Sequence, residues 1–444
     1  MPMRMGLVNP DDPAVQTVVF SKPLISARIG LIASCRERRA YPDGYHIRNW
    51  LTVTGNRWAR YAAPEKIYGG GSLDWTAAYA SAIGEAVERT SLSYYDHRDL
   101  FVARFDLVDR AFCERESFLF YLDAQYADPG FPFRKPDFSQ PIAWVKGWSL
   151  TEQKAVHVPA SLVYMPYQPR PGEPLFTDSV SVGTSCARSP NTAAVLAILE
   201  LVERDAWTMV WETRACVPEI SPGDIEQIPV VMMAMGHGLH IRVFDLTNDT
   251  GIPSFLAICL SDDSLPSLAI GTAARLNPRD AIECAISEAI TSWRSTSYLC
   301  MDGVVDLDAK TLQNRRRTDF SLQSLYYANP DNRHHFDFLL RQNSPHVRIE
   351  HLSFLESEGR DLERIKTIMM ATGHRVVLFD LTQRDAELVG LYVVRAVSTS
   401  LMRQPLGLLR PLAHPRLFTF FRERGLVDEG VRPEDLLQSF HPFP

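Results

Sequence analysis

Two stretches of this sequence decide its fold: residues 76–92 read TAAYASAIGEAVERTSL, and residues 192–208 read TAAVLAILELVERDAWT. A third stretch, residues 280–294, reads DAIECAISEAITSWR. All three are rich in alanine, contain no proline, and carry an alanine seven residues before a glutamate. Because residues at that spacing lie on one side of a helix, the small alanines allow close packing on a sheet while the glutamate projects from the same side. We therefore predict three helices that pack on sheets.

The chain also contains an internal repeat. Residues 224–237 read DIEQIPVVMMAMGH and residues 361–374 read DLERIKTIMMATGH, with eight of fourteen positions identical. Each copy continues as a strand, an Asp-Leu-Thr turn and a second strand, so we expect Asp245 and Asp380 to be turn residues. Helices that alternate with strand-loop-strand units predict an α/β fold, a single domain with pseudo-repeated units.

The predicted organisation has three parts. Residues 1–60, which include TVVFSKPLISARIGLIAS and HIRNWLTVTG, are expected to form short strands continuous with the core. Residues 60–430 form the main domain, in which the aromatic- and proline-rich residues 100–175 are expected to be an insertion or a peripheral lobe. Residues 431–444 form a proline-containing tail. The sequence thus predicts one large domain with a tail.

Composition argues against several classes of protein. The chain has 444 residues, is 45% hydrophobic and carries a net charge of −7, which gives no sign of a nucleic-acid-binding surface. No uncharged apolar run reaches the roughly 18 residues of a membrane span. The seven cysteines are odd in number and widely spaced, which fits reduced thiols better than disulfides. We therefore expect a cytoplasmic protein with no nucleic-acid partner and no membrane partner.

Two pairs of glutamates are the main candidates for chemistry. Glu85 and Glu88 lie one turn apart on the first predicted helix, and Glu200 and Glu203 repeat this spacing on the second. A single pair of this kind usually lies on a solvated face, but both pairs stand in apolar surroundings, which indicates an interior cleft. Four carboxylates that meet there would repel one another by about 3 kcal/mol per pair at roughly 6 Å and an effective dielectric of roughly 20. Oxygen ligands without His or Cys favour Mg²⁺, which commonly bridges the phosphates of a nucleotide.

The sequence lacks the usual phosphate-binding loop, because no GxxxxGK[ST] motif occurs. A glycine run, residues 69–71, precedes the first helix. It is either a place where backbone amides approach phosphate or a plain helix-entry loop, and the sequence leaves both readings open.

At these residues the sequence resembles the YcaO superfamily. Residues 69–96, 179–206 and 271–295 are similar, in order, to its Gly-rich turn with SxxxGExxER, its Ser-x-Gly turn with ExxER, and its third motif. The matching positions are Ser81, Glu85, Glu88 and Arg89 in the first, Ser181, Gly183, Ser185, Glu200, Glu203 and Arg204 in the second, and Gly271, Pro278, Ala281, Glu288 and Arg294 in the third. The resemblance implies that these residues bind ATP and Mg²⁺, with the two glutamate pairs as metal ligands.

The resemblance also implies a reaction. A Cys, Ser or Thr side chain of a ribosomally made precursor peptide adds to the preceding amide, ATP phosphorylates the amide oxygen, and elimination of phosphate leaves a thiazoline or oxazoline. Phosphate leaves far more readily than an amide oxygen, and Mg²⁺ stabilises the phosphoryl charge during transfer. The enzyme then needs to supply mainly positioning and electrostatics.

The last residues, HPFP, resemble a short form of the proline-rich tail with which azoline-forming members end. This implies that the terminal carboxylate of Pro444 reaches the active site, where Arg294 is the second expected catalytic residue. It further implies the cyclodehydratase subunit of a microcin-type synthetase. The expected partners are a precursor peptide, an E1-like peptide-recruiting protein and an FMN-dependent dehydrogenase.

Five positions depart from the family pattern, the first being Gly70, the nearest equivalent of a Lys that is common in the first Gly-rich turn. Val182, Arg188 and Thr192 stand where the second signature typically has Asn, Asn and Glu, and Thr291 stands where the third usually has Gln. None of these changes removes an expected metal ligand. Two alternatives stay open: a YcaO enzyme that makes a thioamide or amidine, and a non-catalytic peptide-binding scaffold with an altered nucleotide site.

Overall fold

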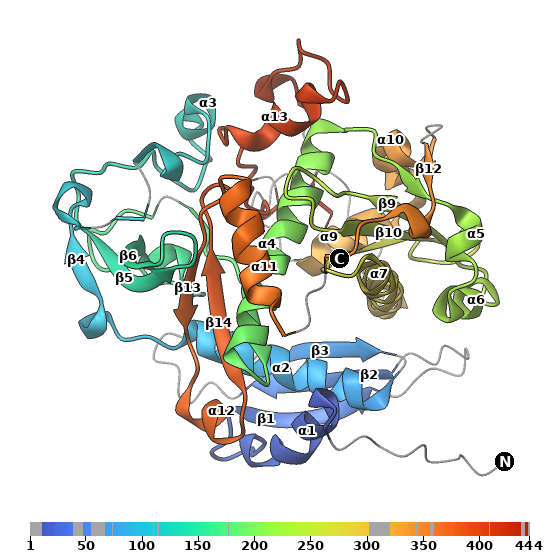
Figure 1. Ribbon diagram of the computed structural model, residues 1–444, viewed down its shortest axis with the longest axis horizontal. Coiled ribbons are helices and arrows are strands. Elements are labelled where there is room, and N and C mark those ends of the chain that lie inside the picture. The colour runs from blue at the N-terminus through green and yellow to red at the C-terminus, as the bar shows by residue number, and fades with distance from the viewer. Residues whose placement is uncertain are drawn as a thin grey trace.

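The structure is a computed structural model, and it describes most of the chain. The described residues are 11–38, 48–54, 67–72, 74–109, 111–112, 115–175, 177–301, 320–341, 345–355, 359–407, 409–436 and 440–442. Within them the chain forms three sheets, with helices between and around them (Figure 1). The predicted α/β class is confirmed.

The N-terminal sheet is antiparallel and packs against the first of the three helices predicted from residues 76–92, 192–208 and 280–294, which we call the signature helices. Its strands in spatial order are β1 (Ile32–Arg38), β2 (Arg48–Thr54) and β3 (Ile67–Ser72). Helix α2 (Trp75–Ser93) lies across this sheet (Figure 1). It begins where the Asp74 carboxylate accepts a hydrogen bond from the Ala77 backbone N–H, at 2.8 Å. The first predicted helix is therefore confirmed.

The prediction of strands near the N-terminus is only partly right. Strands β1 and β2 exist, but the chain before them forms helix α1 (Pro13–Phe20) and a short 3-10 turn (Lys22–Leu24). Asp12 is the reason, because its carboxylate accepts hydrogen bonds from two backbone N–H groups of the first turn, and a proline occupies the first helical position. This cap outweighs the β-branched residues that suggested a strand.

The central sheet is sandwiched between two signature helices. Its strands in spatial order are β11 (Leu268–Ala274), β10 (Ser254–Leu260), β9 (His240–Asp245), β8 (Glu219–Ile220) and β12 (His346–Val347). One face of β10 and β11 packs on α7 (Pro278–Met301), and the other face packs on α4 (Pro190–Thr213). Every residue of both strands is buried. The second and third predicted helices are thus confirmed as α4 and α7.

The third sheet contains a strand that belongs to the second family motif, residues 179–206. Its strands in spatial order are β4 (Phe101–Ala103), β5 (Ile142–Ser149), β13 (Val377–Asp380), β14 (Tyr392–Val397) and β7 (Thr184–Ala187), with β6 (Lys154–Pro159) paired to β5. Residues 100–175 lie at one side of the molecule (Figure 1), yet β5 pairs with β13, so this segment extends the core sheet. Helix α4 runs through the middle of the molecule and contacts both β14 and β7.

The internal repeat is visible as two copies that differ in detail. The first copy gives α5 (Pro222–Ile225), α6 (Pro229–Met235), β9 and β10, and the second gives α11 (Asp361–Ala371), β13, α12 (Arg384–Leu388) and β14. Pro229 starts a new helix in the first copy, whereas the second copy has Lys366 there and stays continuous. Asp245 and Asp380 each accept the backbone N–H of the Thr two residues later, at 2.9 Å, which confirms both predicted turns.

The remaining helices are α3 (Asp123–Ala127), α9 (Phe320–Ala328), α10 (Asp337–Leu340) and α13 (Arg416–Glu423). Among the described helices, none combines the length and the apolar character that crossing a membrane would require.

Candidate active site

Two glycines set how closely the signature helices approach their sheets. A Cβ on Gly70 of β3 would lie 2.4 Å from the Ala82 backbone nitrogen of α2, and a Cβ on Gly271 of β11 would lie 2.3 Å from the Ala285 carbonyl oxygen of α7. Only a residue without a side chain fits there. Residues 69–71 belong to β3, so the reading of them as a helix-entry loop is wrong. The reading in which their backbone amides approach phosphate stays a prediction.

Glu203, Arg204 and Glu288 meet at β11 around the side chain of Thr272. The Thr272 hydroxyl donates to Glu203 Oε1 at 2.8 Å and accepts from Arg204 Nη1 at 2.9 Å. The Thr272 backbone N–H donates to Glu288 Oε2 at 2.8 Å. Arg204 Nη2 lies 3.1 Å from Glu203 Oε1 and 3.9 Å from Glu288 Oε1. One threonine of β11 thus joins a residue pair of α4 to a residue of α7.

Glu200 lies one turn before Glu203 on α4 and is held by the turn that precedes β7. The backbone N–H of Gly183 donates to Glu200 Oε2 at 2.9 Å. Gly183 has φ +86°, and a Cβ there would lie 2.6 Å from the Ala396 carbonyl oxygen, so the turn requires glycine. The Ser-x-Gly part of the second signature is therefore a turn that positions a glutamate.

The first pair of glutamates, the dyad Glu85 and Glu88, lies beside Arg89 of the same helix. Arg89 Nη2 lies 3.5 Å from Glu85 Oε1, and Arg89 Nε lies 3.8 Å from Glu88 Oε1. The Glu88 side chain is 14% exposed and the Glu85 side chain 32% exposed. Both side chains are therefore half-buried, and the interior cleft that their apolar neighbours in the sequence indicated stays a prediction.

The five glutamates influence one another electrostatically. Burial raises the pKa of Glu88 well above the usual glutamate range, Arg89 lowers it, and Glu200 and Glu85 raise it further. Burial likewise raises the pKa of Glu200, where Arg204 opposes the rise and Glu203 adds to it. For Glu288, burial is again the largest cause, Arg204 opposes it, Glu203 adds to it, and the pKa is about 7. The two dyads and Glu288 form one coupled cluster that spans α2, α4 and α7.

The cluster has an excess of negative charge. Three arginines act on it: the half-buried Arg89, and the buried Arg204 and Arg395 of β14, of which Arg395 interacts with Glu88 and Glu200. Among the described residues, no three His, Cys, Asp or Glu side chains are already gathered around a single metal position. Five carboxylates facing three guanidinium groups fit a divalent cation as the missing positive charge. The side chains would have to turn from arginine toward the metal in order to ligate it.

Other residues of the predicted site lie as follows. Ser81 is exposed on α2 beside Gly70, Ser181 is buried in the turn before β7, and Ser185 lies in β7 paired with Val394. Arg294 lies further along α7 than Glu288, and its Nε donates to the Tyr298 hydroxyl at 3.4 Å. The structure thus places Arg294 beside Tyr298. Pro444 lies outside the described residues.

The positions that depart from the family pattern have structural contacts. Arg188 donates to the Val389 carbonyl oxygen and lies over the Phe20 ring at 5.4 Å. The Thr192 backbone N–H is capped by the Ser189 hydroxyl at 3.1 Å, at the start of α4. Arg188 therefore ties the end of β7 to α1 and to the residue that follows α12.

The tail reaches the same helix that carries the second dyad. Trp207 Nε1 donates to the Pro442 carbonyl oxygen at 3.2 Å, and the Tyr327 hydroxyl donates to the Phe440 carbonyl oxygen. His441 is fully buried, and its pKa is lowered well below the usual range by burial first and then by Arg204. The described end of the tail therefore passes close to the glutamate cluster.

Reasoning from the sequence missed Thr272 and Arg395. A threonine in a buried strand looks like an ordinary β-former, and an arginine in YVVRAV looks like an outward-facing residue. Only the structure shows that Thr272 bridges two helices and that Arg395 is 3% exposed.

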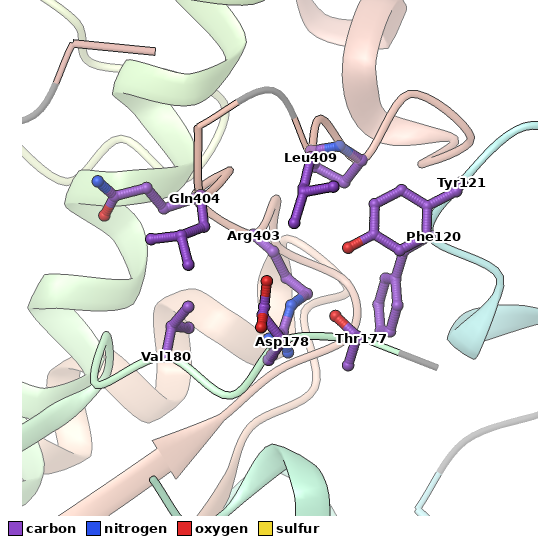
Figure 2. A pocket seen from close by; sticks show the side chains of 10 residues that line it. Phe120, Tyr121, Thr177, Asp178, Val180, Arg403, Gln404 and Leu409 are labelled. Atoms are coloured by element: carbon purple, nitrogen blue, oxygen red, sulfur yellow. Dashed lines mark hydrogen bonds between the residues drawn. The ribbon is translucent and has the colours of Figure 1, made fainter. Parts of the chain in front are cut away.

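Cavities lined by described residues lie outside the cluster. A small one of about 10 Å³, room for about one water, is lined by Phe120, Tyr121, Thr177, Asp178, Val180, Arg403, Gln404, Leu406, Leu409 and Pro411 (Figure 2). A larger one of about 330 Å³ is lined by Asp224, Gln227, Ile228, Pro229, Arg279, Ile282, Glu283, Arg348, Ile349 and Glu350. Neither is lined by a glutamate of the cluster.

Comparison with known proteins identifies the family of this chain. The family model described as YcaO cyclodehydratase, ATP- and Mg²⁺-binding, matches residues 69–401, more than half of the chain. An uncharacterized protein of Methanothermobacter thermautotrophicus is 28% identical over 51% of this chain and 57% of its own length. An uncharacterized protein in the tfuA 3' region of Rhizobium leguminosarum bv. trifolii is 30% identical over 44% of this chain and 45% of its own length. The chain thus matches about half the length of these relatives.

Solved structures of the same fold include three that are described as follows. A heterocyclase in complex with substrate and cofactor has a TM-score of 0.81 and 22% identity, covering 97% of this chain and 57% of that one. YcaO of Methanopyrus kandleri bound with AMPPCP and Mg²⁺ has a TM-score of 0.58 and 17% identity, covering 84% and 86%. The E. coli microcin synthetase McbBCD complex has a TM-score of 0.61 and 12% identity, covering 94% and 98%. At these identities the likeness shows the fold.

Proposed function

Since this chain belongs to the YcaO family, which is described as ATP- and Mg²⁺-binding, we propose that it is an ATP-dependent cyclodehydratase. It converts Cys, Ser or Thr residues of a ribosomally made precursor peptide into thiazolines or oxazolines. The observation that carries this proposal is the group of five buried or half-buried glutamates on three helices, which outnumber the arginines that face them. In the nucleotide-free chain the raised pKa values allow protons to offset part of this charge, and Mg²⁺ would take the place of those protons when it binds with a nucleotide.

The proposal assigns the following roles to the residues of the cluster. The metal ligands are Glu85, Glu88, Glu200 and Glu203. The nucleotide contacts are Ser81, Arg89, Ser181, Ser185, Arg204 and Glu288. Mg²⁺ supplies a positive charge that stabilises phosphoryl transfer.

The protein's own groups act by position and charge. Arg89 and Arg204 lie within 4 Å of the glutamates, so they would be close enough to contact the phosphate oxygens of a nucleotide whose metal these glutamates held. Thr272 keeps Glu203 and Glu288 at a fixed separation, since its hydroxyl and its N–H each hold one of them. We assign catalytic positions to Arg294 and Pro444, with support for Pro444 from the contact between Pro442 and Trp207.

The proposed partners follow from the family. They are the precursor peptide, an E1-like protein that recruits it, and an FMN-dependent dehydrogenase that oxidises azolines to azoles, as in a microcin-type synthetase. We also propose a cytoplasmic location, where the described free cysteines would stay reduced.

The test is mass spectrometry of a Cys- or Ser-containing precursor incubated with this chain, its partner protein, ATP and Mg²⁺. The proposal expects loss of one water for each ring formed, and consumption of ATP. Sulfur gain without water loss would instead identify a thioamide-forming enzyme. An unchanged peptide, together with no binding of Mg-ATP, would identify a scaffold.

A further inference from the structure

Arg395 of β14 donates hydrogen bonds to the carbonyl oxygens of the turn that holds Glu200. Its guanidinium is buried, at 3% exposure of the residue. It donates to the Ser181 carbonyl at 2.8 Å and to the Thr184 hydroxyl at 2.9 Å through Nη1, and to the Val180 carbonyl at 2.9 Å through Nη2. Nη1 also donates to the Val182 carbonyl. A planar guanidinium is suited to this task because its donors point in fixed directions within one plane.

The geometry of the turn connects this arginine to the glutamate cluster. The Thr184 N–H donates to the Ser181 carbonyl at 3.0 Å, and Gly183 has φ +86°, which together give a type II turn. The central peptide of the turn joins Val182 to Gly183. Its carbonyl oxygen accepts from Arg395, and its N–H donates to Glu200 Oε2 at 2.9 Å. This peptide is therefore held at both ends, by a cation at its oxygen and by a carboxylate at its N–H.

We propose that Arg395 is a positioning residue that acts on Glu200 through the Val182–Gly183 peptide. The guanidinium fixes the orientation of this peptide, and the N–H then holds one oxygen of Glu200 and leaves the other for the metal. The inference rests on the proposed function, because it concerns the role of Glu200 as a metal ligand.

Without Arg395, the central peptide of the turn would lose the contact at its carbonyl oxygen, one of the two that hold it. A type II turn presents its central peptide to solvent or to a partner, and either orientation of this peptide is accessible when no partner fixes it. A second arginine, Arg403, donates to the Asp178 carbonyl at 2.8 Å and holds the chain before the turn. Arg403, Asp178 and Val180 meet at the small cavity, where Val180 is the residue next to the turn (Figure 2). Arg403 thus anchors the entry to the turn, and Arg395 fixes the turn itself.

A purely structural role for Arg395 is the competing explanation. Loss of a buried arginine destabilises most proteins, so weaker activity alone would not distinguish the two explanations. A positioning role predicts more than weaker activity: Arg395 and Glu200 should affect nucleotide binding through the same Val182–Gly183 peptide. Substitutions at two residues of one pathway are not independent in their effects.

The experiment measures the affinity of the purified full chain for Mg-AMPPCP by isothermal titration calorimetry. The variants are Arg395→Met, Arg395→Lys, Glu200→Asp, and each Arg395 variant combined with Glu200→Asp. We expect Arg395→Met to weaken binding by about 10- to 100-fold, the usual effect of removing a residue that orients a metal ligand. Arg395→Lys retains the charge but loses the planar fork, and is expected to lie between Arg395→Met and the unchanged chain. Each double variant is expected to bind more tightly than the product of the two single effects would give.

Arg242 provides a matched control. It lies on β9, pairs with Glu219 and donates to the Leu340 carbonyl at 2.7 Å, and so resembles Arg395 in bonding a backbone carbonyl. Arg242→Met is expected to lower the thermal unfolding temperature and leave the affinity for Mg-AMPPCP unchanged. If Arg395→Met does not fold, Arg395→Lys and its double variant decide the question. Effects of Arg395 and Glu200 that multiply independently would overturn the inference, as would Arg395 variants that bind as tightly as the unchanged chain. Failure of the unchanged chain to bind Mg-AMPPCP would instead reject the proposed function.

Discussion

Gly271→Ala should damage the site through packing alone. A Cβ at this position would lie 2.3 Å from both the Ala285 carbonyl oxygen and the Ala289 nitrogen. Non-bonded heavy atoms need roughly 3.5 Å, so α7 would have to move away from β11 by about 1 Å. Both neighbours are backbone atoms and cannot rotate away. We expect the free energy of unfolding to fall by about 1–3 kcal/mol, the usual range for an overpacked core.

The same movement would carry Glu288 away from the N–H of Thr272, now at 2.8 Å. A displacement of about 1 Å at a catalytic group lowers activity by roughly 100-fold. The assay is urea-induced unfolding together with the rate of ATP-dependent peptide dehydration. Gly223→Ala is the matched control, because a Cβ there meets nothing within 4 Å, and its stability should stay the same or rise slightly. Equal stability and activity for Gly271→Ala and Gly223→Ala would refute the claim that close helix-sheet contact sets the geometry of the site.

Three further predictions concern residues around the cluster. Thr272→Val keeps the shape of the side chain but removes its hydrogen bond to Glu203. It should therefore lower the free energy of unfolding in urea by about 1–3 kcal/mol and weaken the binding of Mg-nucleotide. Unchanged binding would contradict this. Trp207→Phe removes the hydrogen-bond donor to the Pro442 carbonyl. Carboxypeptidase should then cleave the tail faster, while circular dichroism should show an intact fold. Equal cleavage rates would show that this contact does not hold the tail. Glu288 has a pKa of about 7 in the folded chain, above its unfolded value near 4.5, so this carboxyl binds more proton in the folded state and the stability that it contributes should fall as the pH rises from about 4.5 to about 7. Glu288→Gln should make that fall shallower, and an identical pH dependence in the two proteins would show that this carboxyl does not titrate as described.

The sequence predicted the signature helices and the repeat because their causes are local. Alanine-rich stretches without proline form helices wherever they occur, and the two Asp-Leu-Thr turns close through bonds two residues long. The glutamate pairs could be identified because burying a carboxylate among apolar residues costs free energy unless another group compensates for it, so such carboxylates indicate a site. Helix α1 could also have been found from its own residues, since Asp12 followed by Pro13 is a strong start signal.

The rest depends on contacts between residues far apart in the chain. Residues 69–71 form a strand because β2 pairs with them, and this pairing is invisible in a glycine run read by itself. Thr272 and Glu203 are 69 residues apart, and Arg395 and Ser181 are 214 residues apart. No periodicity in either segment indicates such partners. Sequence alone therefore locates the glutamates and the arginines next to them in the chain, and misses Thr272 and Arg395, which contact the site from distant segments.

The central claim is that glutamates of α2 and α4 together hold Mg²⁺ and a triphosphate. A crystal structure of this chain with AMPPCP and Mn²⁺, in which the anomalous signal of manganese marks each metal, tests it most directly. We predict metal positions ligated by carboxylate oxygens from both helices, with Arg89 and Arg204 turned toward phosphate. Metal and nucleotide bound elsewhere, with the glutamates still paired to these arginines, would contradict the account.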